Sequence, residues 1–86
     1  MLKQLRRYII THRCNTIRKI IARWAPPSEN NTEAYIRTVA KTLGISPNEP
    51  LTATQETLIA LAAAMTIVEH GQSVPQETWS KAYTLI

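Results

Sequence analysis

The sequence predicts an all-α fold, a compact bundle of about five helices forming a single domain over residues 1–86. The chain has no Phe and only two Gly, whereas a β-sandwich or barrel needs more aromatic and turn residues. Apolar residues also recur at the three- and four-residue spacing of a helix face along most of the chain. A chain of 86 residues is long enough for one small core.

A first helix is predicted from the start of the chain to about His12. Its outward face is basic, and its other face is apolar. The apolar positions are Leu2, Leu5 and Ile9, with Tyr8 beside them.

A second helix is expected to follow, with Asn15 as its N-cap and Trp24 at its end. Its apolar positions follow the i, i+3, i+4, i+7 pattern without a gap and are Ile17, Ile20, Ile21 and Trp24. Pro26 and Pro27 cannot continue a helix, so the chain must turn there.

The elbow over residues 24–36 combines this helix end with the start of the next helix. Asn30 is predicted to be the N-cap, with Glu33 three residues later at capping-box spacing, so the third helix opens near Asn31. The elbow carries a dense set of hydrogen-bonding side chains, namely Ser28, Glu29, Asn30 and Asn31. These side chains either fix the elbow or bind a ligand.

The third helix repeats the apolar pattern and ends at Gly44. Its apolar positions are Ile36, Val39, Ala40 and Leu43. A proline-containing connector over residues 45–51 follows, with Ile45 and Leu51 expected to point inward.

The fourth helix is expected from about Thr54 to Gly71 and is apolar on nearly every side, which places it at the centre of the bundle. Ser73 and Pro75 then begin a last short helix. One stripe of that helix closes the core from outside and consists of Trp79, Ala82, Tyr83 and Ile86.

The net charge of +4 is unevenly distributed. Residues 1–23 hold seven basic residues and no acid, while the remainder holds three basic residues and six glutamates. The predicted basic face consists of Lys3, Arg6, Arg7, Arg18, Lys19 and Arg23. It is either a solvated helix surface or a surface for nucleic acid or an acidic protein, although no polar recognition helix accompanies it.

Two carboxylates around a sugar would permit glycoside cleavage, and the sequence allows Glu29 or Glu33 to face Glu69. The capping box explains Glu33 more simply, and a hydrogen bond or ion pair would explain Glu69. Trp24 and Tyr35 either stack on a sugar ring beside the elbow or belong to the core.

No metal site and no cofactor are predicted, because His12 and His70 have no other ligand at metal-binding spacing. The lone Cys14 cannot form an internal disulfide and has no base beside it, which favours a buried structural thiol. The start of the chain lacks a signal-peptide pattern, and the longest apolar run, residues 58–65, is too short to span a membrane.

Two runs, residues 14–18 (Cys-Asn-Thr-Ile-Arg) and residues 23–33 with Tyr35, resemble small phage and prophage structural proteins related to lysozyme-like peptidoglycan hydrolases. The shared signature is Trp-Ala-Pro-Pro-x-Glu-Asn-x-Thr. The resemblance covers about residues 2–72, continuing through Val39, Gly44, Pro47, Pro50, Leu51, Val68, Glu69 and Gly71. Longer members of that family have an N-terminal segment before the point where this chain starts, and Arg13 stands where they usually have glycine.

The resemblance implies a truncated lysozyme-like domain, prophage-derived and associated with cell-wall glycan or virion structure, without hydrolytic activity alone. If the domain were active, it would cleave peptidoglycan glycan strands, but the resemblance assigns no catalytic residue. The candidate ligand-binding residues are Trp24, Ser28, Glu29, Asn30, Asn31, Tyr35 and Glu69. The implied partners are a peptidoglycan fragment or a phage structural protein, and so small a core is also compatible with self-association. The expected location is the host cytoplasm or the virion.

The alternative is a small regulatory or interaction protein that uses the basic N-terminal face to bind nucleic acid or an acidic protein partner.

Overall fold

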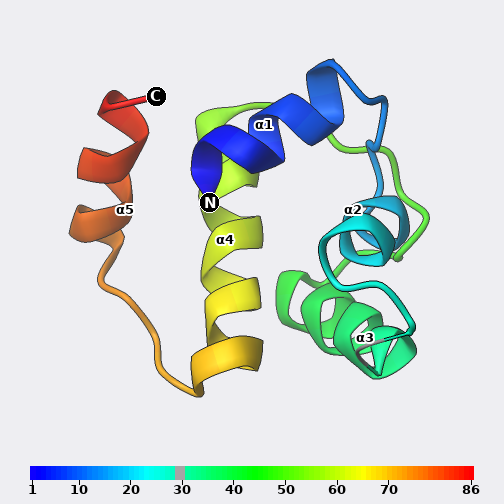
Figure 1. The fold of residues 1–86 in the computed structure, drawn as a ribbon. Helices are drawn as coiled ribbons and strands as arrows, with labels where there is room; N and C mark the ends of the chain where they lie inside the picture. Colours follow the sequence, from blue (N-terminus) through cyan, green and yellow to red (C-terminus); the bar gives the residue numbers. More distant parts are fainter. Residues whose placement is uncertain (29–30) are drawn as a thin grey trace.

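The structure, a computed structural model, describes residues 1–28 and 31–86, and within them the chain forms five α-helices and no strand (Figure 1). The helices are α1 (Leu2–Ile10), α2 (Ile17–Trp24), α3 (Thr32–Leu43), α4 (Gln55–His70) and α5 (Gln76–Thr84). The Cα radius of gyration is 12.0 Å, equal to the value of about 12 Å expected for a compact chain of this length. The predicted all-α bundle of about five helices is therefore confirmed.

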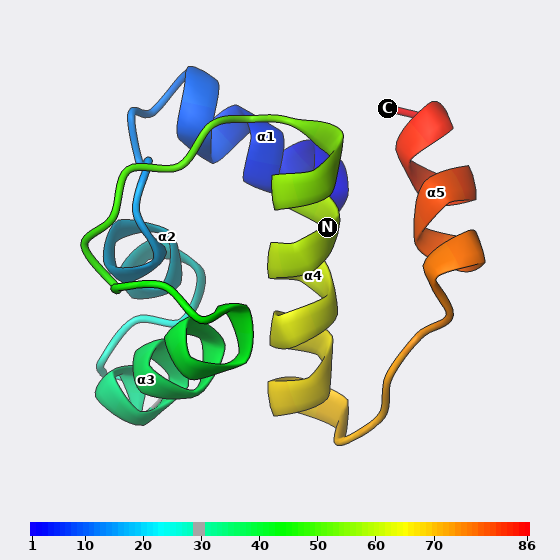
Figure 2. The same cartoon turned by 180° about the vertical axis from the view of Figure 1, so that it is seen from behind.

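Helix α4 occupies the centre of the bundle, as its all-round apolar sequence predicts. It packs against α1, α3 and α5, and both views show it standing between α5 on one side and α2 and α3 on the other (Figures 1 and 2). Its buried side chains are Leu58, Ile59, Leu61, Ala62, Ala64 and Met65. The core is completed by the apolar stripes of α1, α2 and α3.

Two predicted N-caps are wrong by one residue. The N-cap of α2 is Thr16, whose hydroxyl accepts from Lys19 N, and not Asn15. The N-cap of α3 is Asn31, whose side chain accepts from Ala34 N, and the predicted cap Asn30 itself lies outside the described residues. In each case the next residue along also has a side-chain oxygen suited to capping, so the sequence pattern leaves the exact position open.

The two glycine stops are confirmed. Gly44 and Gly71 follow α3 and α4 with φ of 69° and 68°, in the left-handed region that favours glycine.

The connector after α3 lies along the start of α2. Ile45 and Leu51 pack half-buried against the core, as predicted. The backbone N–H of Leu51 donates to Asn15 O at 2.7 Å, and Arg18 N donates to Pro47 O at 3.1 Å. These bonds fix the connector against the loop that opens α2.

Helix α5 covers the outer side of α4 and α1, but none of its residues is buried. Its predicted stripe packs half-buried against the core. Cys14 is also half-buried, so the predicted buried thiol is wrong; its Sγ lies 3.7 Å from His12 O. None of the described helices is both long enough and apolar enough to cross a membrane.

Candidate functional site

Three of the predicted ligand-binding residues converge where α2, α3 and α4 meet. The indole Nε1 of Trp24 donates to Glu69 Oε2 at 3.2 Å, and the Tyr35 hydroxyl donates to the same oxygen at 2.9 Å. Trp24 is half-buried, Tyr35 is buried and Glu69 is exposed. Two aromatic side chains thus donate hydrogen bonds to one exposed carboxylate. We call Trp24, Tyr35 and Glu69 the aromatic–carboxylate cluster.

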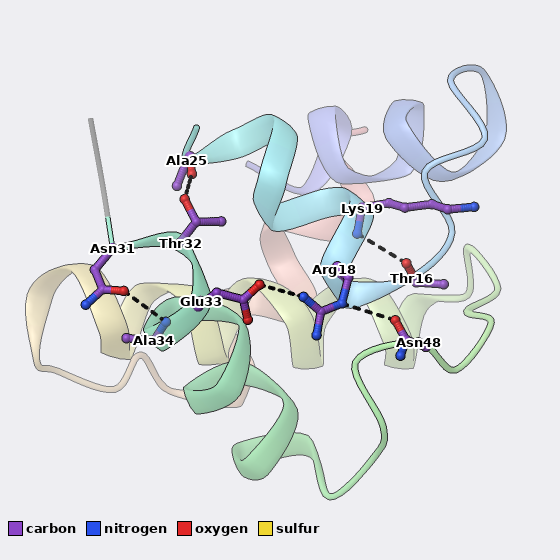
Figure 3. A network of polar contacts seen from close by, with 9 residues as sticks. All are labelled: Thr16, Arg18, Lys19, Ala25, Asn31, Thr32, Glu33, Ala34 and Asn48. Carbon is purple, nitrogen blue, oxygen red and sulfur yellow. Dashed lines mark hydrogen bonds and ion pairs between the residues drawn. The ribbon is translucent and has the colours of Figure 1, made fainter. Parts of the chain in front are cut away.

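The elbow between α2 and α3 sets the distance between the two aromatic residues. Thr32 Oγ1 donates to Ala25 O at 2.6 Å and is buried, which ties the end of α2 to the first residue of α3. Figure 3 shows this bond beside the Asn31 cap. Because Trp24 ends α2 and Tyr35 lies one turn into α3, the closed elbow brings both side chains to the last turn of α4.

Tyr35 supplies a neutral donor to the cluster. Burial raises its pKa well above the ordinary value near 10, because the charged phenolate would lose its hydration. The hydrogen bond to Glu69 and the negative charge of that carboxylate raise the pKa further, while the interaction with Trp24 acts in the opposite direction. The phenol therefore keeps its proton throughout the physiological pH range.

A shallow hollow of about 280 Å³ adjoins the cluster. Its lining comes from α3, its N-cap and one residue of α4: Asn31, Ala34, Tyr35, Thr38 and Val68. The hollow therefore offers an amide, two hydroxyls and aliphatic groups, and it is joined to the cluster through Tyr35. The predicted residue Asn31 lies at its edge.

Of the other polar elbow residues, those that the structure describes do not join this site. Ser28 is exposed, and Glu29 and Asn30 lie outside the described residues. Glu33 Oε1 accepts from Arg18 Nη1 at 2.7 Å, so its carboxylate pairs with α2, and its predicted capping-box partner Asn30 lies outside the described residues (Figure 3). Glu33 and Tyr35 are two residues apart on α3, so their side chains point to different sides of the helix. Tyr35 points to Glu69, and Glu33 therefore does not face Glu69.

The predicted basic face is divided among several places. Arg18 is occupied by Glu33 and by Asn48, whose Oδ1 accepts from Arg18 Nε at 3.2 Å. Arg6 Nη1 donates to Ile86 O at 3.5 Å, and Lys19 is exposed beside the start of α2. The remaining three residues line one hollow of about 580 Å³ and are Lys3, Arg7 and Arg23.

Among residues 1–28 and 31–86, no three His, Cys, Asp or Glu residues lie close enough together to hold a metal ion. His12 instead lies edge-on to Tyr8, with ring centroids 6.1 Å apart.

A search of known proteins found a phage protein with a similar sequence. Protein P5 of Pseudoalteromonas phage PM2 is 44% identical over 69 residues, which cover 80% of this chain and 42% of P5. The chain is similar to a phage protein. The match spans less than half of the length of P5. No protein-family description matches the chain, and no solved structure matches it.

Sequence reasoning missed the contacts that fix the elbow. The bond between Thr32 and Ala25 and the bonds from Arg18 to Glu33 and Asn48 join residues of different elements, which no periodicity within one helix relates. One signal was available for the main cluster: Trp24, Tyr35 and Glu69 are polar-tipped residues at the edges of apolar stripes, where a buried indole or phenol usually finds a partner.

Proposed function

We propose that this chain is a helical domain of a phage protein that binds the glycan strands of peptidoglycan at the aromatic–carboxylate cluster, without cleaving them alone. The convergence of Trp24, Tyr35 and Glu69 carries the proposal. The similarity to P5 supports a phage origin. The truncated lysozyme-like domain and its contact with the cell wall as part of a virion rest on the resemblance of the elbow to lysozyme-like phage structural proteins.

The chemistry of the cluster suits a sugar. A pyranose ring has an apolar face and a rim of hydroxyls, so its sites combine an aromatic surface with fixed polar groups. Trp24 provides a half-buried indole whose orientation is set by its bond to Glu69. Within the described residues both protein donors use Oε2 of Glu69, which leaves Oε1 to accept from a sugar hydroxyl. A bond to an ionised acceptor is roughly twice as strong as a neutral one.

Binding without cleavage follows from the described carboxylates. Hydrolysis of a glycosidic bond generally uses two carboxyl groups about 5–9.5 Å apart across the sugar. Glu33 is held by Arg18 and lines a hollow with Arg18, Pro27 and Ile36, whereas Glu69 is bound by Trp24 and Tyr35. The cluster therefore presents one carboxylate, which orients a glycan by hydrogen bonding.

The direct test is an NMR titration of the ¹⁵N-labelled protein with a purified disaccharide–tetrapeptide muropeptide. We expect shifts at the Trp24 indole N–H and at the amides around Tyr35 and Glu69. Trp24→Phe and Glu69→Gln should each weaken binding by about tenfold, since each removes a charge-assisted hydrogen bond.

Two matched controls separate the cluster from the rest of the molecule. Trp79→Phe removes an indole N–H on α5, and Glu77→Gln removes an exposed α5 carboxylate whose only ion pair among the described residues is with Lys81. Neither should change the affinity. Absence of shifts, or equal losses in the controls, would overturn glycan binding, and clearance of a cell-wall suspension by the protein would overturn the claim that it does not cleave.

A further inference from the structure

We propose that the exposed side of α1 together with the end of α2 is a second binding surface, which holds the phosphate backbone of a nucleic acid without reading its bases. Its central residues are Lys3, Arg7 and Arg23. This surface is separate from the aromatic–carboxylate cluster, and the proposal does not depend on glycan binding.

The basic hollow has the shape and charge for an anion. Lys3 and Arg7 are four residues apart on α1 and therefore lie on the same helix face. Arg23 reaches the same hollow from the last turn of α2. Within the described residues none of these three side chains is in an ion pair, whereas Arg18 and Lys81 are. Three positive charges are therefore available to a ligand.

The third charge is held in position by an aromatic ring. The guanidinium carbon of Arg23 lies 5.7 Å from the ring centroid of Tyr8, a cation–π distance. Tyr8 is 8% exposed, and its hydroxyl accepts from Gln4 Nε2 at 2.9 Å, so the ring is fixed on the core. A side chain held in this way loses less entropy when it binds a phosphate.

A neighbouring hollow extends the surface. It measures about 210 Å³, shares Lys3 and Arg7 with the first, and adds Arg6, Ile10 and Thr11. Two adjoining hollows with shared cations suit a polymer of regularly spaced phosphates better than a single anionic group.

The same surface is poorly suited to a membrane or to an acidic protein. The apolar residues of α1 face the core, where Leu2, Leu5 and Tyr8 are buried, and are not available for insertion into lipid. Ile10 and Met1, which are 63% and 39% exposed, line different hollows of this surface and form no apolar centre of the kind that a protein interface needs.

Base recognition is not expected. The amide of Gln4, the residue type that reads adenine in the major groove, is occupied by the Tyr8 hydroxyl. Lysine and arginine side chains that contact phosphates fix position and affinity without sequence information.

The test is fluorescence anisotropy with two labelled DNA duplexes of unrelated sequence. We expect equal affinities for both, and a plot of log affinity against log salt with a slope of about −2 to −3, as three phosphate contacts predict. The double variant Arg7→Glu/Arg23→Glu should bind at least about tenfold more weakly at low salt. Circular dichroism would verify that this variant remains helical.

Lys41→Glu provides a control, because Lys41 is an exposed residue in the last turn of α3, a helix that does not contact α1. It should lower the affinity by no more than about twofold, by its effect on net charge alone. No binding at low salt, equal losses in the control, or binding to phosphatidylglycerol vesicles but not to DNA would each overturn the proposal. Muropeptide titration of the double variant should be unchanged, which keeps the two sites experimentally distinct.

Discussion

Helices α4 and α5 both follow a helical apolar pattern, yet they hold opposite positions in the fold. Helix α4 has 16 residues, six of them buried, with a Thr54 side-chain cap and a left-handed Gly71 stop. Helix α5 has nine residues, none buried, and its N-cap Pro75 makes no side-chain cap bond. An apolar stripe therefore predicts that a helix forms, while the burial of that helix depends on how many other helices surround it.

Helix α5 also contains a buried hydrogen-bond donor without an acceptor among the described residues. Trp79 Nε1 is buried and finds no hydrogen-bond acceptor within the described part of the chain. An unpaired buried donor costs about 1–3 kcal/mol. We therefore expect α5 to open locally at lower free energy than the core formed by α1 to α4.

The largest expected effect lies in α4. Leu61 is fully buried, and Leu61→Ala should lower the free energy of unfolding by about 3 kcal/mol, through lost burial and the cavity left behind. Urea denaturation followed by circular dichroism measures this change. Leu85→Ala, just after α5, is the matched control, since Leu85 is 87% exposed and should cost less than about 0.5 kcal/mol. Equal costs in the two variants would contradict the contrast between the helices.

A smaller and more local effect is expected in α5. Trp79→Ala should increase amide hydrogen exchange in α5 by an amount corresponding to about 2 kcal/mol, because most of the packing of this helix is lost. Exchange in α4 should change little. Trp79→Phe keeps the ring contacts and removes the unpaired donor, so it should leave α5 protection equal or higher. Loss of protection in α4 after Trp79→Ala would show that α5 belongs to the same cooperative unit.

Most of the fold could be predicted from the sequence, but less of the candidate site could. The stripes of α1 to α4 and the stops at Gly44 and Gly71 are predictable because helical period and glycine conformation are local properties. The caps Thr16 and Asn31 are missed by one residue, because two capping side chains stand side by side in each case. The meeting of Trp24 with Glu69 depends on the packing of α2 on α3 and of α3 on α4, which no local pattern encodes.

The hydrogen bond from Tyr35 on α3 to Glu69 at the end of α4 should make the free energy of unfolding depend on pH. The raised pKa of Tyr35 means that the folded protein keeps the phenol proton at pH values where the unfolded chain loses it. The stability that Tyr35 contributes is complete below about pH 10 and falls by about 1.4 kcal/mol per pH unit above that value. Tyr35→Phe should cost about 1 kcal/mol at neutral pH through the lost bond to Glu69, and this cost should shrink above pH 10.

Denaturation of both proteins from pH 8 to 11 measures that difference. A difference for Tyr35→Phe that stays constant to pH 11 would contradict the coupling.

The smallest effect concerns the turn between α1 and α2, far from α5. Arg13 has φ of 55°, which costs an L-residue about 1–2 kcal/mol, whereas glycine adopts it freely at an entropy cost of about 0.5–1 kcal/mol. Arg13→Gly should therefore raise the free energy of unfolding by about 0.5–1 kcal/mol and leave local exchange in α5 unchanged. Arg13→Ala removes the same charge but keeps the strained backbone, so it should give no gain. If both variants stabilise equally, repulsion among the basic residues of the N-terminal quarter, and not the backbone conformation, limits the stability of this turn.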